Sequence, residues 1–379
     1  MYSRTLDKVP VFLLEDTKQE KKSFFGKRYK PLFGSYIGTP KSLGINGIRF
    51  PYGIIPLPTF ITNLRIRSNF TFMFSADDYI GTIDIIDIKI AGFYEMNIWN
   101  KKTNLRYSYR GITGIHRHFV PKNLEKAVCC TRKRSRYIRI VWDKNKNRFA
   151  LVFRMKGDSV NPSFNGSFVS SYDEKSPAFT SVLPFPITRR CYVSYQRKFE
   201  AESKIFIFKS KRSRKLEKNL LPDIYSDTAL CLLISVRAYF KFRNVASFSA
   251  GLGNANFTES GKKCDIVFRF TNISNLPENS DEYNENVLFC NNKITPLPSV
   301  RITHEMGFSK KWVIQDTEGM VDLVFTPLST RQKFISSIIF AAQYNFVFGT
   351  YEGTIFTKDG NAINIKDFPG ICKDMRTRL

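Results

Sequence analysis

The last quarter of the sequence restricts the fold more than any other stretch, because it reads as paired β-strands. From Val321 to Phe325 apolar side chains occupy every second position, the period of a half-buried strand, and Pro327 ends the run. Residues 354–357 then lead into Asp359-Gly360, and residues 361–365 follow. Asp-Gly supplies the positive φ angles of a two-residue hairpin turn. The stretch therefore predicts a β-hairpin and an all-β protein.

Shorter runs of the same kind fill much of the remaining chain. These runs are at 64–74, 83–90, 93–99, 137–142 and 149–154, and turn residues separate them. Strands joined by short turns predict an antiparallel meander. Two polar stretches are not expected to form strands. Residues 157–176 are predicted to be a long loop, and Gly251 to Asn256 a turn. We expect two consecutive antiparallel β barrels or sandwiches, with few short helices.

The division of the chain follows from its length and from one charged run. A chain of 379 residues is long enough for two domains, and Lys209 to Lys218 is the best candidate for the boundary between them. The sequence thus predicts a basic N-terminal arm at 1–33, one β-barrel domain at 34–208 and a second at 209–379.

The net charge of +26, from 59 Lys plus Arg against 33 Asp plus Glu, favours anionic partners. An anionic membrane surface is one such partner, and a general lysine bias is an equal alternative. Basic runs at 131–137 and 209–215 would suit phosphates, but no nucleic-acid-binding module accompanies them, so nucleic acid is the least favoured partner.

The cysteines and the N-terminus predict a cytoplasmic protein. Seven cysteines show no disulfide framework, which indicates free thiols in a reducing compartment. No apolar run approaches the roughly 20 residues of a membrane-spanning helix. The first 16 residues are too polar and too short in apolar length for a signal peptide.

The histidines and cysteines of the sequence do not predict a metal site or a catalytic nucleophile. His116 and His118 share one face of an expected strand, but His304 is the only other histidine, so no metal site is predicted. No cofactor motif is present. Cys129 lies beside a basic run that would lower a thiol pKa if exposed, and a buried inert thiol is favoured.

Three carboxylates are candidates for proton transfer in an apolar cavity: Asp84, Glu285 and Asp322. Burial raises a carboxyl pKa and makes such a group a usable acid. Asp322, however, lies on the alternate face of its strand and is expected to point to solvent.

An ordered set of features resembles the family named domain of unknown function 2804. The set comprises Glu285 to Phe289, Ile294 to Val300, Trp312 to Ile314, Gly319 to Pro327, Gln343, Phe348-Gly349, Gly353, Asp359-Gly360 and Gly370 to Cys372. Residues 76–81 and 182–195 are also similar, so the resemblance spans 34–379. It implies two calycin-like barrels with hydrophobic interiors, because the family is distantly similar to proteins that include carotenoid hydratases and certain cyclases. The chain departs from the family at Lys373, Met375 and Leu379.

Three functions follow as hypotheses. The first is binding of a lipid-like or isoprenoid molecule in an apolar pocket, with Asn286, Gln343 and Trp312 as candidate ligand-binding residues. The second is a cofactor-independent hydratase, cyclase or isomerase that uses a buried carboxyl. The third is nucleic-acid binding.

Overall fold

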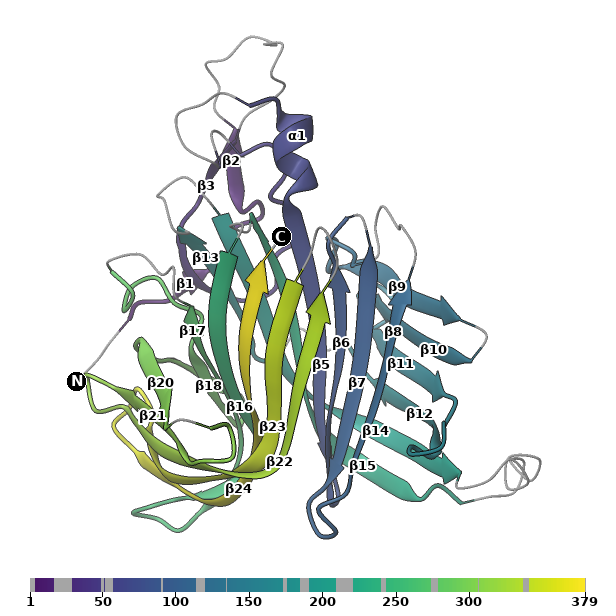
Figure 1. Cartoon of the computed structure of the whole chain (residues 1–379). Coiled ribbons are helices and arrows are strands. Elements are labelled where there is room, and N and C mark those ends of the chain that lie inside the picture. Colours follow the sequence, from purple (N-terminus) through teal and green to yellow (C-terminus); the bar gives the residue numbers. More distant parts are fainter. Residues whose placement is uncertain are drawn as a thin grey trace.

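The computed structural model describes residues 4–16, 29–48, 51, 57–89, 91–113, 120–133, 135–172, 176–184, 191–208, 221–239, 243–273, 279–305, 307–336 and 341–378. Within these residues the chain is almost entirely β-strand, with a single short helix, α1 (Thr59–Leu64) (Figure 1). The predicted all-β class is confirmed. No helix in this described part has the length and apolar character needed to cross a membrane.

The first sheet has 13 strands in the described residues and is antiparallel along its main path. In spatial order the path is β8 (Arg106–Thr113), β7 (Gly92–Asn100), β6 (Tyr79–Asp87), β5 (Ile66–Ala76), β15 (Ile224–Tyr239), β14 (Cys191–Phe208), β12 (Ser163–Ser170), β11 (Arg148–Met155), β10 (Arg136–Asp143) and β9 (Lys126–Lys133). Off this path, β13 (Ala178–Pro184) joins β14 to β4 (Gly34–Ile37), and β4 pairs in parallel with β1 (Asp7–Lys8). The Arg136 guanidinium donates to the Arg110 carbonyl, so the two ends of the path approach one another as in a nearly closed barrel.

The second sheet has nine strands in the described residues, all antiparallel. Its order is β19 (Lys293–Pro296), β18 (Val287–Cys290), β17 (Lys263–Ile273), β16 (Arg243–Phe257), β24 (Ala362–Arg378), β23 (Ala341–Phe356), β22 (Val321–Ser336), β21 (Trp312–Asp316) and β20 (Val300–His304). A separate two-stranded ribbon, β2 (Leu14–Asp16) with β3 (Tyr29–Pro31), lies near α1 at one end of the molecule (Figure 1).

Strand alternation gives each sheet an inner and an outer face. On β5, Phe70, Phe72 and Phe74 enter the core of the first sheet, whereas the residues between them face the second sheet. The second sheet has its own core, around Trp312, Phe325 and other apolar residues. Each sheet therefore curves around its own apolar side chains.

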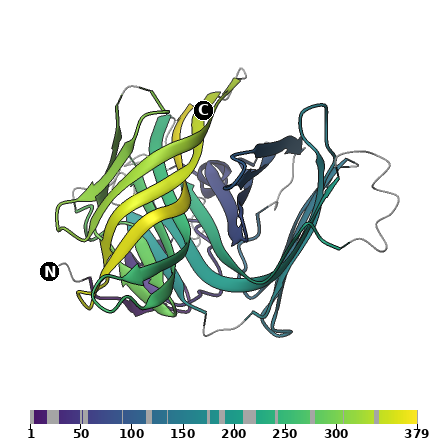
Figure 2. The same ribbon diagram turned by 90° about the horizontal axis from the view of Figure 1, so that it is seen from below.

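A third apolar cluster joins the two sheets back to back. It combines outward residues of the first sheet, such as Leu232 and Val236, with Leu252, Phe289 and Phe348 of the second. Trp99 stacks on Phe348 with ring centroids 5.6 Å apart. Figure 2 shows the two curved sheets side by side. Packing across this junction makes one body of the two halves of the chain.

Three local predictions need correction. The predicted hairpin exists, but Phe356 pairs with Ala362 and the Thr357 amide bonds the Asn361 carbonyl, which leaves three residues in the turn. Gly360 alone takes positive φ, at 83°, as in a three-residue turn with a bulge. The expected loop 157–176 contains β12, because its apolar residues alternate with polar ones.

The expected turn from Gly251 to Asn256 is instead part of β16. A Cβ on Gly251 would lie 2.5 Å from the Phe268 ring and 2.8 Å from the Phe368 ring. The glycine therefore makes room for aromatic side chains of neighbouring strands rather than for a change of chain direction.

The chain changes sheets between Tyr239 and Arg243. The predicted boundary at 209 lies earlier, inside residues 209–220 that are outside the described part, and it assigns β15 to the second domain. In the structure β15 pairs with β5 and β14 at the centre of the first sheet. The division into domains itself stays a prediction.

Candidate ligand site between the sheets

A cavity of about 100 Å³ lies between the two sheets. Its apolar wall includes Met73, Ile234, Val236, Phe346 and Ile371. Its polar lining comes from Asn69, Thr71, Thr82, Asp84, Tyr192, Asn244, Ser249, Arg269 and Lys373. A cavity needs only about 10–15 Å³ to hold one water molecule, so this one has room for a small organic group.

The first sheet provides polar groups at this cavity because of the alternation on β5 and β6. Asn69 and Thr71 lie between the core phenylalanines of β5, and Thr82 and Asp84 lie on either side of the core residue Ile83. The Thr71 hydroxyl donates to Asp84 Oδ1 at 2.5 Å. Two buried oxygens, Thr82 Oγ1 and Asn69 Oδ1, have no hydrogen-bond partner. Thr82 lines the cavity and is 0% exposed, so bulk water does not satisfy this hydroxyl.

A buried ion pair closes one side of the cavity. Arg269 Nη1 and Nη2 lie 2.8 and 2.9 Å from the two carboxylate oxygens of Glu285. The Tyr192 hydroxyl donates to the same carboxylate at 2.8 Å, and Gln196 Nε2 donates to the Glu285 carbonyl at 2.7 Å. Tyr192 and Gln196 belong to the first sheet, so Glu285 links the two sheets through its carboxylate and its backbone carbonyl.

Glu285 is held as a carboxylate by these contacts. Burial raises its pKa, but the Arg269 charge and the hydrogen bonds to the carboxylate outweigh burial and hold the pKa below its ordinary value. An ionised, fully engaged carboxylate is a poor proton donor. Glu285 thus bonds Arg269 and Tyr192, two residues at the cavity wall, and its predicted role as an acid stays a prediction.

A second cluster of charged side chains surrounds Tyr344, close to Asp84. Lys333 contacts the Glu95 carboxylate, which also accepts from Tyr344 and from Asn97. Lys333 and Lys373 each place Nζ 5.4 Å from the centroid of the Tyr344 ring. Burial raises the pKa of Tyr344 to about 12, and nearby Asp84 adds to the effect. Tyr344 thus stays a protonated hydrogen-bond donor at neutral pH.

Arg106 extends this polar region across the junction. Its Nη1 donates to the Phe346 carbonyl at 2.9 Å, and its Nη2 donates to Asn97 Oδ1 at 3.1 Å. The guanidinium also lies over Phe346 and Phe348, 4.9 and 5.1 Å from the ring centroids. Positive charge from Arg106 and Lys373 therefore gathers on this side of the junction, whereas burial lowers the pKa of Lys333 to about 7.

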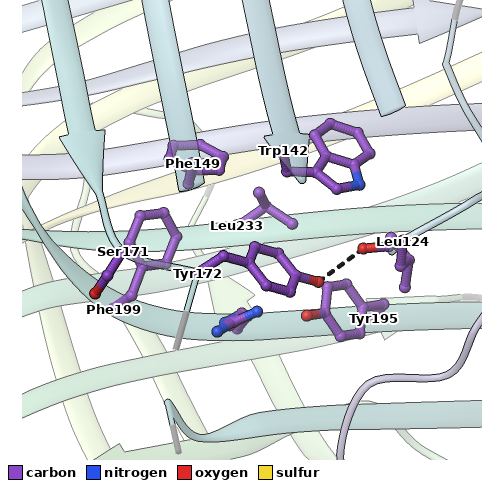
Figure 3. Close-up of a pocket in the computed structure, with 9 residues that line it drawn as sticks. Leu124, Trp142, Phe149, Ser171, Tyr172, Tyr195, Phe199 and Leu233 are labelled. Carbon is purple, nitrogen blue, oxygen red and sulfur yellow. Dashed lines mark hydrogen bonds between the residues drawn. The ribbon is translucent and has the colours of Figure 1, made fainter. Parts of the chain in front are cut away.

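A cavity on the inner side of the first sheet is much smaller. It measures about 20 Å³ and lies between Trp142, Phe149, Tyr172 and Leu233 (Figure 3). The Tyr172 hydroxyl donates to the Leu124 carbonyl at 2.7 Å. That volume fits about one water molecule. This cavity is too small for a lipid-like ligand, and the rings of Trp142, Phe149 and Tyr172 line it.

A larger cleft of about 480 Å³ lies elsewhere and has mainly polar walls. Asp77, Glu200 and Asp265 bring carboxylates to it, and Lys101 donates from Nζ to the Asp77 carbonyl. Its hydroxyl and charged lining suits water better than an apolar ligand.

The structure separates the three predicted carboxylates. Asp84 lines the intersheet cavity and is 6% exposed, and Glu285 bonds two residues that line it. Asp322 lies exposed on β22 and accepts from Gln315 at 2.8 Å. Two of the three candidates therefore lie at one place, although their roles stay predictions.

The candidate ligand-binding residues lie away from this cavity. Asn286 is buried, and its side chain bonds the Thr271 amide and the Pro298 carbonyl. Trp312 lies in the core of the second sheet, 4.4 Å from the His304 ring. Gln343 is half-buried near the start of β23. None of them is among the residues that line the described cavity.

Other reactive groups are few in the described part of the chain. None of the seven cysteines forms a disulfide, and Cys130 is the only one of them that is not buried. Among described residues, no three His, Cys, Asp or Glu side chains are grouped to hold a metal ion. His116 and His118 lie outside these residues, as do Arg134 and the basic run from Lys209.

Sequence reasoning missed Arg269, Tyr192 and Lys373 as cavity residues. Arg269 had a usable signal, because it is a lone charge inside the otherwise apolar run from Ile266 to Phe270. A charge at such a position requires a buried partner. Nothing local in the sequence identifies Glu285 as that partner.

Comparison with known proteins places the C-terminal third of the chain in context. Residues 259–379 match the family model described as domain of unknown function (DUF2804), which confirms the predicted resemblance over these residues. No curated protein matches the chain. Among solved structures it is similar to kievitone hydratase from Nectria haematococca, with 8% sequence identity, a TM-score of 0.42, and coverage of 81% of this chain and 88% of that chain. A likeness of this degree carries no conclusion about activity.

Proposed function

We propose that the cavity between the two sheets binds a small molecule that is mainly apolar and carries a polar group, such as the head of an isoprenoid or lipid-like compound. The observation that carries this proposal is a mostly apolar space that also contains the unpartnered, fully buried hydroxyl of Thr82. Apolar walls with a few placed polar groups are typical of small-molecule sites.

The size of the cavity limits what it holds. Pockets for drug-sized ligands measure about 300–1,000 Å³, and this cavity measures about 100 Å³. It therefore accommodates one ring or one branched end of a molecule. A longer ligand would extend past Asn244 and Met375, where β16 begins and β24 nears its end.

The test uses geraniol, a small isoprenoid alcohol, and isothermal titration calorimetry. Ala246 lines the cavity, so Ala246→Leu fills it, whereas Ala362→Leu makes the same change at the start of β24, away from the cavity. We expect at least a tenfold loss of affinity in Ala246→Leu and less than a twofold change in Ala362→Leu. Equal affinity in all three proteins, or no binding to the wild type, would refute the proposal.

A second candidate function is proton transfer to a bound ligand by Asp84. It is favoured by the position of this carboxyl, which is 6% exposed at the cavity wall and accepts a hydrogen bond from Thr71. Incubation of geraniol in ¹⁸O-labelled water, followed by mass spectrometry, detects hydration. We expect a labelled product with the wild type and none with Asp84→Asn, which keeps the hydrogen bond. A product in both proteins would exclude Asp84 as the acid.

A further inference from the structure

One end of the second sheet carries a row of polar side chains. Ser247 of β16, Asp374 of β24 and Asn345 of β23 are paired directly across adjacent strands. Asn272 of β17 extends the row on one side, and Gln332 of β22 extends it on the other. Figure 1 shows β16, β24, β23 and β22 side by side, with the C-terminus at this end. Five adjacent strands thus each contribute one polar side chain to the same face of the sheet.

The row faces away from the cavity between the sheets. Side chains alternate along a strand, and Ala246, Phe346 and Lys373, which are sequence neighbours of the row, line that cavity. The row therefore lies on the side of the sheet that holds Val347 and Cys372 of its apolar core. A molecule bound on this face would not occupy the cavity.

Three arginines follow the row toward the strand ends. Arg376 is two residues beyond Asp374 on β24, and Arg378 is two residues further and pairs directly with Arg243 of β16. All three are exposed, and none of them forms an ion pair within the described part of the chain. Asp374 is the only acid among these positions; it is 8% exposed and accepts from the Ser247 hydroxyl at 2.9 Å. The face is therefore positively charged.

An aromatic ring and further amides lie beside the arginines. Phe334 of β22 is 68% exposed and pairs with Gln343 of β23, which is half-buried. Gln332, two residues before Phe334, is exposed. Asn345 is 2% exposed, and its Oδ1 has no hydrogen-bond partner. A buried acceptor of this kind is stabilised when a bound molecule donates a hydrogen bond to it.

This combination of side chains selects one kind of partner. Arginines bind phosphates, an exposed ring stacks on an unpaired base, and Asn, Gln and Asp side chains bond the edges of bases. A duplex offers phosphates but keeps its bases stacked on one another, so Phe334 would have no partner. A lipid surface or an acidic protein would pair with the arginines and leave the amide row unused.

We propose that the ends of β16, β24, β23 and β22 bind a short single-stranded nucleic acid, with Arg376 and Arg378 at phosphates and Phe334 stacked on a base. The proposal is independent of the proposed ligand site, which lies on the opposite face of the same sheet. On sequence grounds nucleic acid is the least favoured partner, because only strand pairing brings these residues together.

Fluorescence anisotropy of the full chain tests the proposal, with labelled oligothymidylate, oligouridylate and a duplex of the same length. Arg376→Gln/Arg378→Gln removes two charges from the face. Arg301→Gln/Lys366→Gln removes two exposed charges elsewhere on the second sheet. Phe334→Ala removes the ring, and Phe12→Ala removes an equally exposed ring, at 69%, outside this sheet.

We expect single strands to bind about tenfold more tightly than the duplex, with an affinity that falls as salt rises. Arg376→Gln/Arg378→Gln should lose about tenfold and show a weaker salt dependence, and its control should lose less than about threefold. Phe334→Ala should lose about fivefold or more with an unchanged salt dependence, and Phe12→Ala less than about twofold.

The controls also define what would overturn the proposal. Equal losses in the two double variants would mean that binding follows net charge alone, and equal affinity for the duplex would remove the role of Phe334. Inorganic phosphate that competes as well as uridine monophosphate would reduce the face to an anion site. Any of these results, or no binding by the wild type, overturns the proposal. The substituted side chains are all exposed, so thermal unfolding should match that of the wild type.

Discussion

Replacement of Glu285 by Gln should destabilise the protein strongly. The change keeps an oxygen for the Tyr192 hydroxyl but removes the charge that faces Arg269, whose side chain is only 5% exposed. Removing one partner of a buried ion pair costs about 3–5 kcal/mol, because the other charge stays buried without compensation. Domains are stable by only about 5–15 kcal/mol, so the loss is large.

Urea unfolding, followed by tryptophan fluorescence and far-UV circular dichroism, measures this loss. The matched control is the combination Tyr192→Phe, Arg269→Met and Glu285→Leu, which replaces the network with apolar side chains of similar size. Such replacements of buried ion pairs are often neutral or stabilising. We therefore expect the triple variant to be more stable than Glu285→Gln.

The pH dependence has a defined sign. The pKa of Glu285 is lower in the folded state than in the unfolded chain, where a glutamate titrates near about 4.3. The unfolded state thus binds more protons in acid. The ion pair therefore contributes its full stabilisation above the unfolded-state pKa, and this contribution is lost as the pH falls through the folded-state pKa. The difference between wild type and Glu285→Gln should shrink in acid. A cost below about 1 kcal/mol at neutral pH, or a triple variant less stable than the single one, would refute the reasoning.

Three further predictions concern other parts of the molecule. Thr82→Val, which removes the unpartnered hydroxyl, should weaken geraniol binding about fivefold by calorimetry, the equivalent of one neutral hydrogen bond; unchanged affinity would separate Thr82 from the ligand. Burial raises the pKa of the Cys372 thiol to about 12, and Cys130 is the only cysteine that is half-buried. A disulfide reagent at pH 8 should therefore modify at most one thiol quickly, and the other thiols should react only after urea unfolds the protein. Phe348→Ala should cost about 3–5 kcal/mol in urea unfolding and red-shift tryptophan emission, because Trp99 loses its stacked ring; a variant as stable as the wild type would contradict the packing at the junction.

Local patterns in the sequence predict much of the strand content. Alternation from Phe70 to Phe74 identifies both the strand and its core face, and Asp359-Gly360 locates a hairpin. The same alternation means that Asn69 and Thr71 share the opposite face. The turn type was predicted wrongly because Asp-Gly fits both two- and three-residue turns, and only the pairing of Phe356 with Ala362 decides between them.

Pairings between distant segments decide what the sequence leaves open. β15 enters the first sheet between β5 and β14, about 150 residues from β5 along the chain, and no local pattern indicates that neighbour. No local pattern indicates that Arg269 bonds Glu285, 16 residues away, or that Lys373 lies beside Tyr344. The candidate cavity forms only where these distant strands meet, so its residues cannot be grouped from sequence alone.

The place of β16 in the second sheet has a consequence for dissecting the chain. β16 pairs with β17 on one side and β24 on the other, yet it ends at Phe257, before the family match begins at residue 259. A fragment cut to the matched region would therefore expose two long strand edges that β16 normally joins. Such edges promote aggregation. We therefore expect the segment that matches the family model, residues 259–379, to need β16 for stable expression.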